Sequence, residues 1–475
     1  MPCINWPRPC PRRVAAWLLT SVVCIAGCSP TKEASAGPVP AVGEQATSPA
    51  APSIASPTTP PNEQLEPTRV DARTEPAVPP KPSWEPRPQD VVTPHHPLER
   101  PEAMEYFFGR LAAIDDGKEQ DVVRVVHLGA SMIGADDLPS ILRAKFQTRF
   151  GDGGAGLVLL SRYMPNYLHR WVSIAARGWE HCYIAYLCKR DGHYGLGGTT
   201  FWADSGAQSV IATRTGHELG ATASHVELWY VADKNGGRLD VRVDDGPVER
   251  IDTRADAIED RYWETDVEPG PHKVRVRALP GYGRARAYGV VLETAGPGIV
   301  WDQFSMLGAF TRRMLGWDER HIAGQIAQRD PDLIVFTYGG NDTRRVATGK
   351  LTEDDYVDEY VTAVRRVRAG KPEASCLITA MVDRAKSLEF KISAEHVELI
   401  NRAQRRVAEE AGCAFFDSFT AMGGSGSLVQ WRNLDPPLAS GDLKHLNHRG
   451  RERLGGWIYD AIITGYVEHR GKTQP

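Results

Sequence analysis

The chain has 475 residues, of which 41% are hydrophobic, and a formal net charge of −4. Its length allows more than one domain with a sizeable core. The negative net charge argues against a nucleic-acid-binding protein, because such proteins need an excess of basic residues to meet phosphate groups.

Residues 1–27 have the pattern of an export signal. Arginines precede an apolar run over residues 14–26, which has about half the length of a membrane span. The run ends in Ile25-Ala26-Gly27-Cys28, which resembles the lipobox of bacterial lipoproteins, where the cysteine becomes the lipidated first residue of the mature chain. The alternative is an ordinary cleavage site with an incidental cysteine. We expect a lipid anchor on Cys28, and Ser29 favours the periplasmic face of the outer membrane over the inner membrane.

Residues 28–101 are predicted to form a linker. Between Ser29 and Pro101 the chain holds 18 of its 34 prolines, mixed with Ala, Ser, Thr and Glu, without an apolar period. Such a composition cannot bury enough apolar surface to offset the entropy lost on folding. Because prolines favour extended segments, the linker would let the folded part reach well away from its membrane.

Alternating strand and helix patterns predict an α/β domain in two pieces, over residues 102–162 and 290–466. Buried strands are predicted at Val122–Val126, Leu333–Phe336, Cys376–Ala380 and Ala414–Phe416. Helices are predicted at Met104–Ile114, Leu138–Phe150, Glu319–Gln328, Glu353–Arg368, Ala394–Glu410 and Arg449–Ile463. This βαβ rhythm implies a parallel sheet covered by helices on both faces. The glycine-rich segment 151–156 follows a helix and lacks the lysine of a phosphate-binding loop, so we expect a tight connection there.

Residues 163–289 change to a strand period, which predicts an inserted β-sandwich. Candidate strands at His225–Val231 and Arg238–Val243 flank Asn235-Gly236-Gly237, and a second turn, Asp244-Asp245-Gly246, follows at once, which is a hairpin pattern. Further strands are predicted at Trp263–Val267 and His272–Ala278. The aromatic residues of this insert either form its core, which is their more common use, or stack on sugars: Trp202, Trp229, Tyr230, Tyr262 and Trp263.

Polar residues stand where open α/β sheets place their reactive groups, at the carboxyl ends of strands. Ser131 follows the valine strand, and Asn341 follows the strand at Leu333–Phe336. Asp442 and His445 lie just before the last predicted helix. A serine hydroxyl needs a base to become a nucleophile, and a histidine held by a nearby aspartate is such a base.

Each of these residues also has a structural alternative. Ser131 could cap a helix, and Asn341 could stabilise a turn. His448 competes with His445 for the role of the base, although motif spacing favours His445. Asn447 is expected to cap the following helix, and His127 is expected to be a core residue.

Together the segments resemble the motifs of the SGNH or GDSL hydrolase family, in the family's order. Ser131 corresponds to the family's nucleophile, Gly308 matches the glycine motif, Gly339-Gly340-Asn341-Asp342 matches the GxND motif, and Asp442 with His445 matches the terminal DxxH. The resemblance covers residues 100–165 and 290–465, and it implies a flavodoxin-like three-layer α/β/α sandwich with a parallel sheet. One position departs from the family. Ala130 stands where the family usually has an aspartate, so a side chain expected to anchor the neighbouring loops is missing.

The resemblance implies a serine esterase that needs neither a cofactor nor a metal. Ser131 would attack the ester, His445 would accept its proton, and Asp442 would hold the imidazole. The oxyanion hole would consist of the backbone N–H groups of Ser131 and Gly308 and the side chain of Asn341. A rival for the same triad is an O-acyltransferase, and a rival of another class is an inactive carbohydrate-binding lipoprotein, which Ala130 would favour.

A second resemblance concerns the substrate. Peptidoglycan O-acetylesterases and related proteins are similar in carrying a β-rich, carbohydrate-binding-like insert between the first and second motifs. This implies removal of O-acetyl groups from a cell-envelope polysaccharide. The four cysteines that would remain beside the lipidated one are expected to form disulfides or buried thiols, because their spacing fits no zinc site: Cys182, Cys188, Cys376 and Cys413. The sequence does not predict an oligomeric state.

Overall fold

The computed structural model describes residues 84–204, 206–216, 218–385 and 392–473. The predicted export signal, the lipidation site at Cys28 and most of the predicted linker lie outside the described residues. Among the described helices, none combines the length and the hydropathy that crossing a membrane requires.

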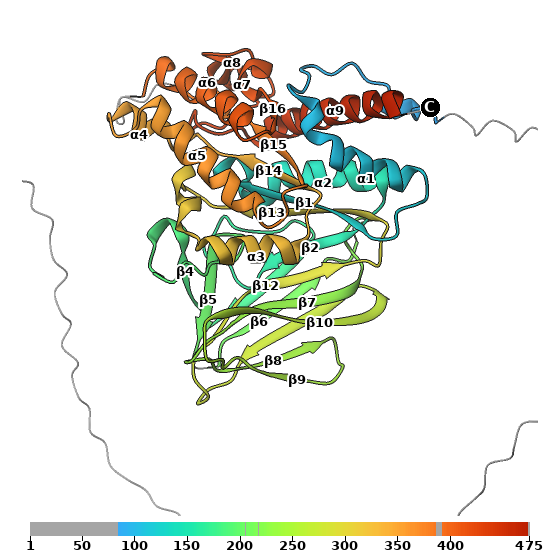
Figure 1. The fold of residues 1–475 in the computed structure, drawn as a ribbon, viewed down its shortest axis with the longest axis vertical. Coiled ribbons are helices and arrows are strands. Elements are labelled where there is room, and N and C mark those ends of the chain that lie inside the picture. Colours follow the sequence, from blue (N-terminus) through green and yellow to red (C-terminus); the bar gives the residue numbers. More distant parts are fainter. Residues whose placement is uncertain (1–83, 205, 217, 386–391, 474–475) are drawn as a thin grey trace, which may run out of the picture. The chain divides into compact units, whose positions relative to one another are not determined.

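A five-stranded parallel sheet forms the centre of the α/β part, in the order β13-β1-β14-β15-β16 (Figure 1). Its strands are β1 (Val122–Gly129), β13 (Gly298–Ser305), β14 (Leu333–Thr337), β15 (Ser375–Thr379) and β16 (Ala414–Phe416). In sequence order within the sheet this is 2-1-3-4-5, the flavodoxin-like order. Almost every residue of these strands is buried, as expected for a parallel sheet covered on both faces.

Helices cover the sheet on both faces. Val123 and Val125 of β1 share one core with α1 (Glu105–Asp115), α2 (Asp137–Phe150) and α9 (His448–Thr473). Val126 and Leu128 face the other core, with α3 (Glu319–Arg329), α5 (Glu353–Arg368) and α6 (Ala394–Glu410). The predicted three-layer α/β/α sandwich is therefore confirmed.

Short helices complete this part of the chain. They are η1 (Pro88–Asp90), η2 (Pro101–Met104), η3 (Ser131–Asp136), η5 (Thr311–Gly316), α4 (Thr343–Ala347), α7 (Ser418–Met422) and α8 (Ser427–Arg432). Local caps explain where the longer helices begin. Thr352 and Asp355 form a reciprocal capping box at α5, and the Asp318 side chain accepts hydrogen bonds from the first turn of α3.

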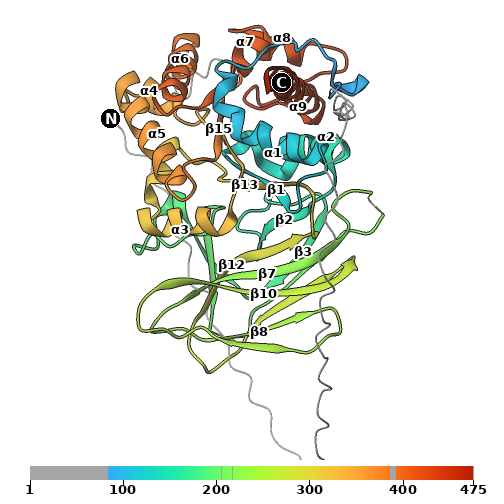
Figure 2. The same cartoon turned by 45° about the vertical axis from the view of Figure 1, so that its right-hand side comes forward.

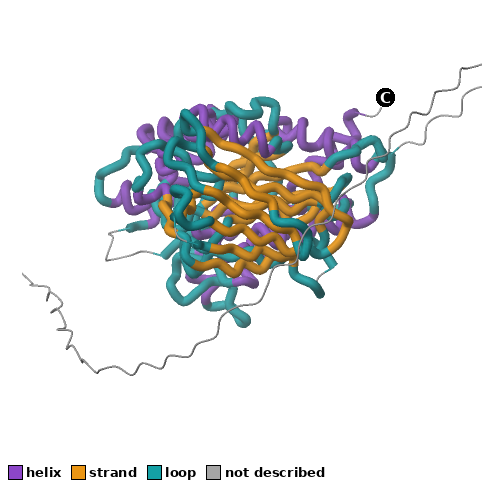
Figure 3. The backbone as a smooth tube through the Cα atoms, turned by 90° about the horizontal axis from the view of Figure 1, so that it is seen from below, coloured by secondary structure: helices purple, strands orange, loops and turns teal. Residues whose placement is uncertain are grey.

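Two antiparallel sheets form the β-rich part, which Figure 3 shows from below. The first has the order β10-β7-β12-β5-β4, with β2 also paired to β12, and the second has the order β3-β6-β11-β8-β9. The first sheet contains β2 (Gly154–Leu159), β4 (Glu180–Tyr183), β5 (Thr199–Ala203), β7 (Ala223–Ala232), β10 (Glu259–Gly270) and β12 (Ala285–Glu293). The second contains β3 (Val172–Arg177), β6 (Gln208–Thr213), β8 (Arg238–Val243), β9 (Glu249–Asp252) and β11 (Lys273–Ala278), and η4 (Ile184–Tyr186) follows β4.

One predicted hairpin is wrong and its neighbour is confirmed. The turn at Asn235-Gly236-Gly237 joins β7 to β8, but these strands pair with different partners in different sheets. The turn crosses between the sheets, where a Cβ on Gly236 would lie 1.8 Å from the Thr253 carbonyl oxygen. The next turn, at residues 244–246, does join a paired hairpin, β8 and β9.

Strand pairing extends the β-rich part beyond residues 163–289. Strand β2 precedes that range, and β12 extends past its end. The two strands nevertheless pair with each other in an antiparallel fashion, with Gly289 opposite Leu159. Figures 1 and 2 show α3 next to these sheets, where it contacts β10.

The four cysteines form two disulfides. Cys182 and Cys188 close a short loop around η4, and Cys376 of β15 is bonded to Cys413, just before β16. Of the two readings that the sequence allowed, disulfides and buried thiols, the structure has the disulfides.

Candidate active site

Ser131 lies directly after strand β1, as the first residue of η3. The backbone of β1 approaches β14 closely at this end, since Ala130 N–H donates to the Thr337 carbonyl over 3.0 Å. A Cβ on Gly129 would lie 2.8 Å from the same oxygen. Small residues therefore precede the serine because two strand ends converge there.

The site lies at the switch point of the sheet. Strand β13 lies on one side of β1 and β14 lies on the other, so the direction in which strands are added changes at β1. Flavodoxin-like sheets bind ligands at such a point, beyond the carboxyl ends of their strands. Ser131 follows β1, and Asn341 follows β14. Both line a pocket of about 90 Å³.

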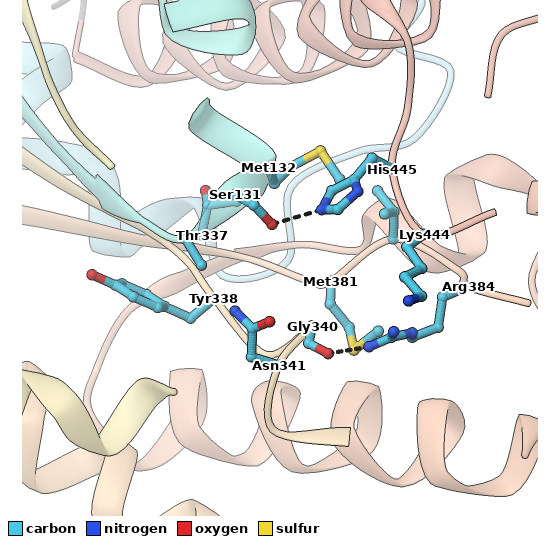
Figure 4. A pocket seen from close by; sticks show the side chains of 12 residues that line it. Ser131, Met132, Thr337, Tyr338, Gly340, Asn341, Met381, Arg384, Lys444 and His445 are labelled. Carbon is cyan, nitrogen blue, oxygen red and sulfur yellow. Dashed lines mark hydrogen bonds between the residues drawn. The ribbon is translucent and has the colours of Figure 1, made fainter. Parts of the chain in front are cut away.

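Ser131, His445 and Asp442 form a continuous hydrogen-bonded chain, of which Figure 4 shows the bond between Ser131 and His445. Ser131 Oγ lies 2.8 Å from His445 Nε2, and His445 Nδ1 lies 2.6 Å from Asp442 Oδ2. The other oxygen of Asp442 accepts backbone N–H bonds from Lys444 and His445, at 3.0 and 3.1 Å. Burial raises the pKa of Asp442, but these hydrogen bonds outweigh it, so its pKa lies below the usual value. An ionised Asp442 fixes a proton on Nδ1 and leaves Nε2 to accept one from Ser131.

The loop before α9 holds His445 in place. Ser440 N–H donates to the His445 carbonyl over 2.8 Å, and Leu446 forms an isolated β-bridge with Ala439. Asn447 Oδ1 accepts the Gly450 N–H over 3.0 Å, which confirms the predicted helix cap. His448 points elsewhere, toward Asp137 at 3.5 Å, so His445 is the histidine that reaches Ser131.

Hydrogen-bond donors for an oxyanion come from three segments. Among the described residues, the backbone N–H groups of Ser131 and Gly308 have no hydrogen-bond partner. Gly308 has a φ of +73°, a conformation that side chains other than glycine adopt with strain. Asn341 Nδ2 donates one hydrogen bond to the Ala309 carbonyl over 2.9 Å, which ties the two segments together. An amide has two N–H donors, so one remains for a ligand.

Asp342 supports this arrangement from behind. Its carboxylate is buried and accepts hydrogen bonds from Thr311 N and Thr311 Oγ1, at 3.0 and 2.8 Å. It thereby connects the residue after Asn341 to the start of η5, just beyond Gly308. Burial raises the pKa of Asp342 to about 6, in spite of these hydrogen bonds.

A different aspartate anchors the chain after Ser131, where Ala130 offers none. Asp136 at the end of η3 is buried and binds Arg143 through both carboxylate oxygens, at 2.9 and 3.1 Å. It also accepts the Arg170 N–H over 2.9 Å. Burial raises the pKa of Asp136, but Arg143, His169 and the Arg170 N–H together lower it below its usual value, so the carboxylate stays ionised.

The sequence interpretation missed the residues that follow β15. Met381, Val382 and Arg384 line the pocket, and Figure 4 shows Met381 and Arg384 across it from Ser131. Arg384 Nη1 donates to the Gly340 carbonyl over 2.5 Å and to Thr343 Oγ1 over 2.8 Å. No motif marks these residues, but their place at the carboxyl end of a central strand was a usable signal.

Other candidates belong to the core. His127 is fully buried between Thr337 Oγ1 at 2.8 Å and Trp301 Nε1 at 3.2 Å, as predicted, and burial lowers its pKa to about 3. Trp229 and Tyr230 are buried in the β-rich core, and the other aromatic residues of the insert pack against it: Trp202, Tyr262 and Trp263.

A protein-family model matches part of the chain. Residues 271–453 match the model of the GDSL-like lipase/acylhydrolase family. The match begins after Ser131, because the β-rich part separates the first motif from the others. No curated protein sequence matches the chain.

A solved structure shares the fold over most of the chain. A structure titled as a peptidoglycan O-acetylesterase in action matches 78% of this chain and 97% of its own, with a TM-score of 0.63 and 19% identity. A lipase/acylhydrolase from Enterococcus faecalis matches 38% of this chain and 80% of its own, with a TM-score of 0.28 and 15% identity. A family two carbohydrate esterase from Cellvibrio japonicus matches 60% of this chain and 99% of its own, with a TM-score of 0.22 and 12% identity. Residues 271–453 therefore resemble GDSL-like lipases and acylhydrolases, and the chain has the SGNH-hydrolase fold.

Proposed function

We propose that the chain is an exported serine esterase that removes O-acetyl groups from a cell-envelope polysaccharide such as peptidoglycan. The observation that carries the proposal is the hydrogen-bonded chain from Ser131 through His445 to Asp442, at 2.8 and 2.6 Å, beside a small pocket.

The proposed reaction has two halves. Ser131 Oγ attacks the ester carbonyl while His445 Nε2 takes its proton, and Asp442 stabilises the resulting imidazolium. The oxyanion would accept hydrogen bonds from the N–H groups of Ser131, Gly308 and Asn341, each contributing about 10²- to 10³-fold. Collapse expels the sugar alcohol, which takes the proton from His445, and leaves an acyl group on Ser131. Water, deprotonated by His445, then releases acetate and restores the serine.

The size of the pocket supports a short acyl group. Its volume of about 90 Å³ is well below the roughly 300 to 1,000 Å³ of pockets that enclose drug-sized ligands. Apolar side chains of Met132, Met381 and Val382 line it beside the catalytic groups. A long fatty acyl chain would have to extend outside this pocket.

An exposed tyrosine supports a sugar substrate. Tyr186 lies in the loop closed by the Cys182–Cys188 disulfide, and 69% of its surface is exposed. Its ring packs edge-on against Tyr183, whose hydroxyl donates to the Leu307 carbonyl over 2.8 Å, one residue before Gly308. The exposed face of Tyr186 offers a stacking surface for a sugar ring, one aromatic contact away from the segment that carries Gly308. The shared fold with a structure titled as a peptidoglycan O-acetylesterase points to the same class of substrate.

Export and lipid anchoring are supported by the lipobox-like sequence at Cys28 and by the two disulfides, which are typical of oxidising compartments. We expect membrane fractionation to recover the wild-type chain with the outer membrane. The Cys28→Ala variant should lose incorporation of a labelled fatty acid, and its recovery in the lipidated fraction would contradict the anchor.

The decisive experiment measures acetate release from purified O-acetylated envelope polymers, without an added sugar acceptor. Ser131→Ala and His445→Ala should each lose about 10³-fold or more in kcat. The matched control is His448→Ala, which removes an exposed histidine three residues further on and should retain the activity. Transfer of acetyl only to an added sugar would show an O-acyltransferase. Equal slow rates for wild type and Ser131→Ala, with glycan binding retained, would show an inactive binding protein.

A further inference from the structure

Three side chains with metal-binding atoms meet away from the candidate active site. His193 lies in the loop between η4 and β5, Asp260 lies at the start of β10, and His321 lies in the first turn of α3. Their ligand atoms all lie within 4.8 Å of one another. None of the three lines the pocket around Ser131.

One of these atoms makes no hydrogen bond within the described part of the chain. His193 Nδ1 is buried and makes no hydrogen bond with any described residue, and it lies 3.7 Å from Asp260 Oδ1. The ring of His193 lies against that of His321, with centroids 4.3 Å apart. A buried polar atom without a partner is uncommon in folded proteins, so it needs an explanation such as an ion.

The other two residues are oriented as metal ligands usually are. His321 Nδ1 lies 2.6 Å from Asp260 Oδ2, and its second ring nitrogen lies 2.6 Å from the Tyr194 carbonyl oxygen. Tyr288 donates its hydroxyl to Asp260 Oδ1 over 2.8 Å. Histidine ligands commonly donate their second N–H to a backbone carbonyl, and carboxylate ligands are themselves hydrogen-bonded.

The site is reachable and has negative surroundings. The three residues line an open cavity of about 660 Å³. The other charged residues of its lining are Glu259, Asp318 and Arg320. Together with Asp260 this makes three carboxylates against one guanidinium, so a cation is favoured.

We propose that His193, Asp260 and His321 bind one divalent transition-metal ion of the zinc class, as a structural link between α3 and the β-rich part. Two imidazoles and a carboxylate are ligands that zinc accepts, at bond lengths of about 2.0 to 2.2 Å. Tetrahedral ligand atoms are then roughly 3.3 Å apart. The distance from Asp260 to His321 Nδ1 is 2.6 Å, and the distance from Asp260 to His193 Nδ1 is 3.7 Å. These distances lie on either side of the tetrahedral value, so small side-chain shifts admit the ion. The ligands come from distant parts of the chain, which is why no compact Cys/His motif marks them.

Zinc titration of the purified full chain, free of histidine tags and stripped with a chelator, tests the proposal. Isothermal titration calorimetry should give one equivalent of Zn²⁺, and zinc should raise the melting temperature, since an ion that binds only the folded chain stabilises it. His193→Ala and Asp260→Asn should lose the stoichiometric binding and the thermal shift. Tyr288→Phe should weaken zinc binding about 10- to 100-fold, because it removes only the hydrogen bond behind the carboxylate.

The matched control is His225→Ala. His225 belongs to another group of possible ligands in the β-rich part, with Glu227 and Glu264. Both of its ring nitrogens already lie near carboxylates, Asp266 at 2.8 Å and Glu227 at 3.3 Å. Zinc binding that is unchanged in His225→Ala supports the proposal. Absence of saturable zinc binding in the folded wild type, or binding that survives in His193→Ala, would overturn it.

Discussion

The substitution Asp442→Asn tests whether the carboxylate assists His445. It preserves size and leaves one oxygen for the backbone N–H groups, but it removes the charge 2.6 Å from His445 Nδ1. A hydrogen bond to a charged group contributes about 1.5 to 3 kcal/mol. A charge pair at about 4 Å adds about 1 kcal/mol in water and about 4 kcal/mol near a protein surface. Because the two side chains are 44% and 34% exposed, solvent screens the charge pair, and we take the low end of that range.

The sum is about 2.5 to 4 kcal/mol of transition-state stabilisation, or a loss of about 70- to 10³-fold in kcat. The assay is hydrolysis of p-nitrophenyl acetate between pH 6 and 9, with circular dichroism to verify folding. The matched control is Asp266→Asn, which disrupts a 2.8 Å contact to His225 outside the pocket and should keep wild-type kcat. A loss below about fivefold for Asp442→Asn, or an equal loss for Asp266→Asn, would refute the assigned role.

Three further outcomes follow from the structure. Tyr186→Ala should raise KM for an O-acetylated polymer about 5- to 30-fold, which corresponds to a contact of about 1 to 2 kcal/mol, and should leave p-nitrophenyl acetate kinetics unchanged. The control is Tyr282→Ala, at a 47% exposed tyrosine in the turn between β11 and β12. A loss of activity with both substrates would contradict a stacking role for Tyr186. Burial raises the folded-state pKa of Asp342 from 3.8 to about 6. Between these two pH values the native chain binds more protons than the unfolded chain. The free energy of unfolding therefore falls as the pH rises through this range, by up to about 3 kcal/mol. Urea unfolding at pH 4 and pH 6.5 should show a smaller fall in Asp342→Asn than in wild type, and identical slopes would contradict this. Cys413→Ala breaks a disulfide that closes a sequence separation of 37, so loop entropy predicts that the free energy of unfolding falls by about 4 kcal/mol. Cys188→Ala breaks a disulfide with a separation of 6, and the expected fall is about 2 kcal/mol. Equal losses would show that loop length does not govern the effect.

Much of the α/β part could be predicted because its elements carry their own signals. The helices at 353–368 and 394–410 have the predicted bounds, since each combines an apolar face with a capping residue just before it, Thr352 and Ser393. The parallel strands are short apolar runs between helices. Ser131 and Asn341 could be placed because a parallel sheet brings the carboxyl ends of its strands to one edge.

The β-rich part was harder to predict because a period of two residues marks a strand without naming its partner. Strands β7 and β8 follow each other around a glycine turn, yet the turn crosses between sheets. The glycine-rich segment 151–156 was expected to be a connection, yet β2 begins within it and pairs with β12. Pairing is decided by contacts between distant segments, and the same holds for the meeting of His193, Asp260 and His321.

Ala130 shows how a missing motif residue can mislead. On sequence grounds the absent aspartate suggested loops without an anchor and favoured an inactive protein. In the structure, the chain after Ser131 is held by Asp136 and Arg143, which are both fully buried. Asp342 holds the segment after Gly308 through two hydrogen bonds to Thr311. Since breaking a buried ion pair costs about 3 to 5 kcal/mol, the Asp136 contact alone can fix the loop. Ala130 therefore gives no physical reason to expect a loosely held nucleophile.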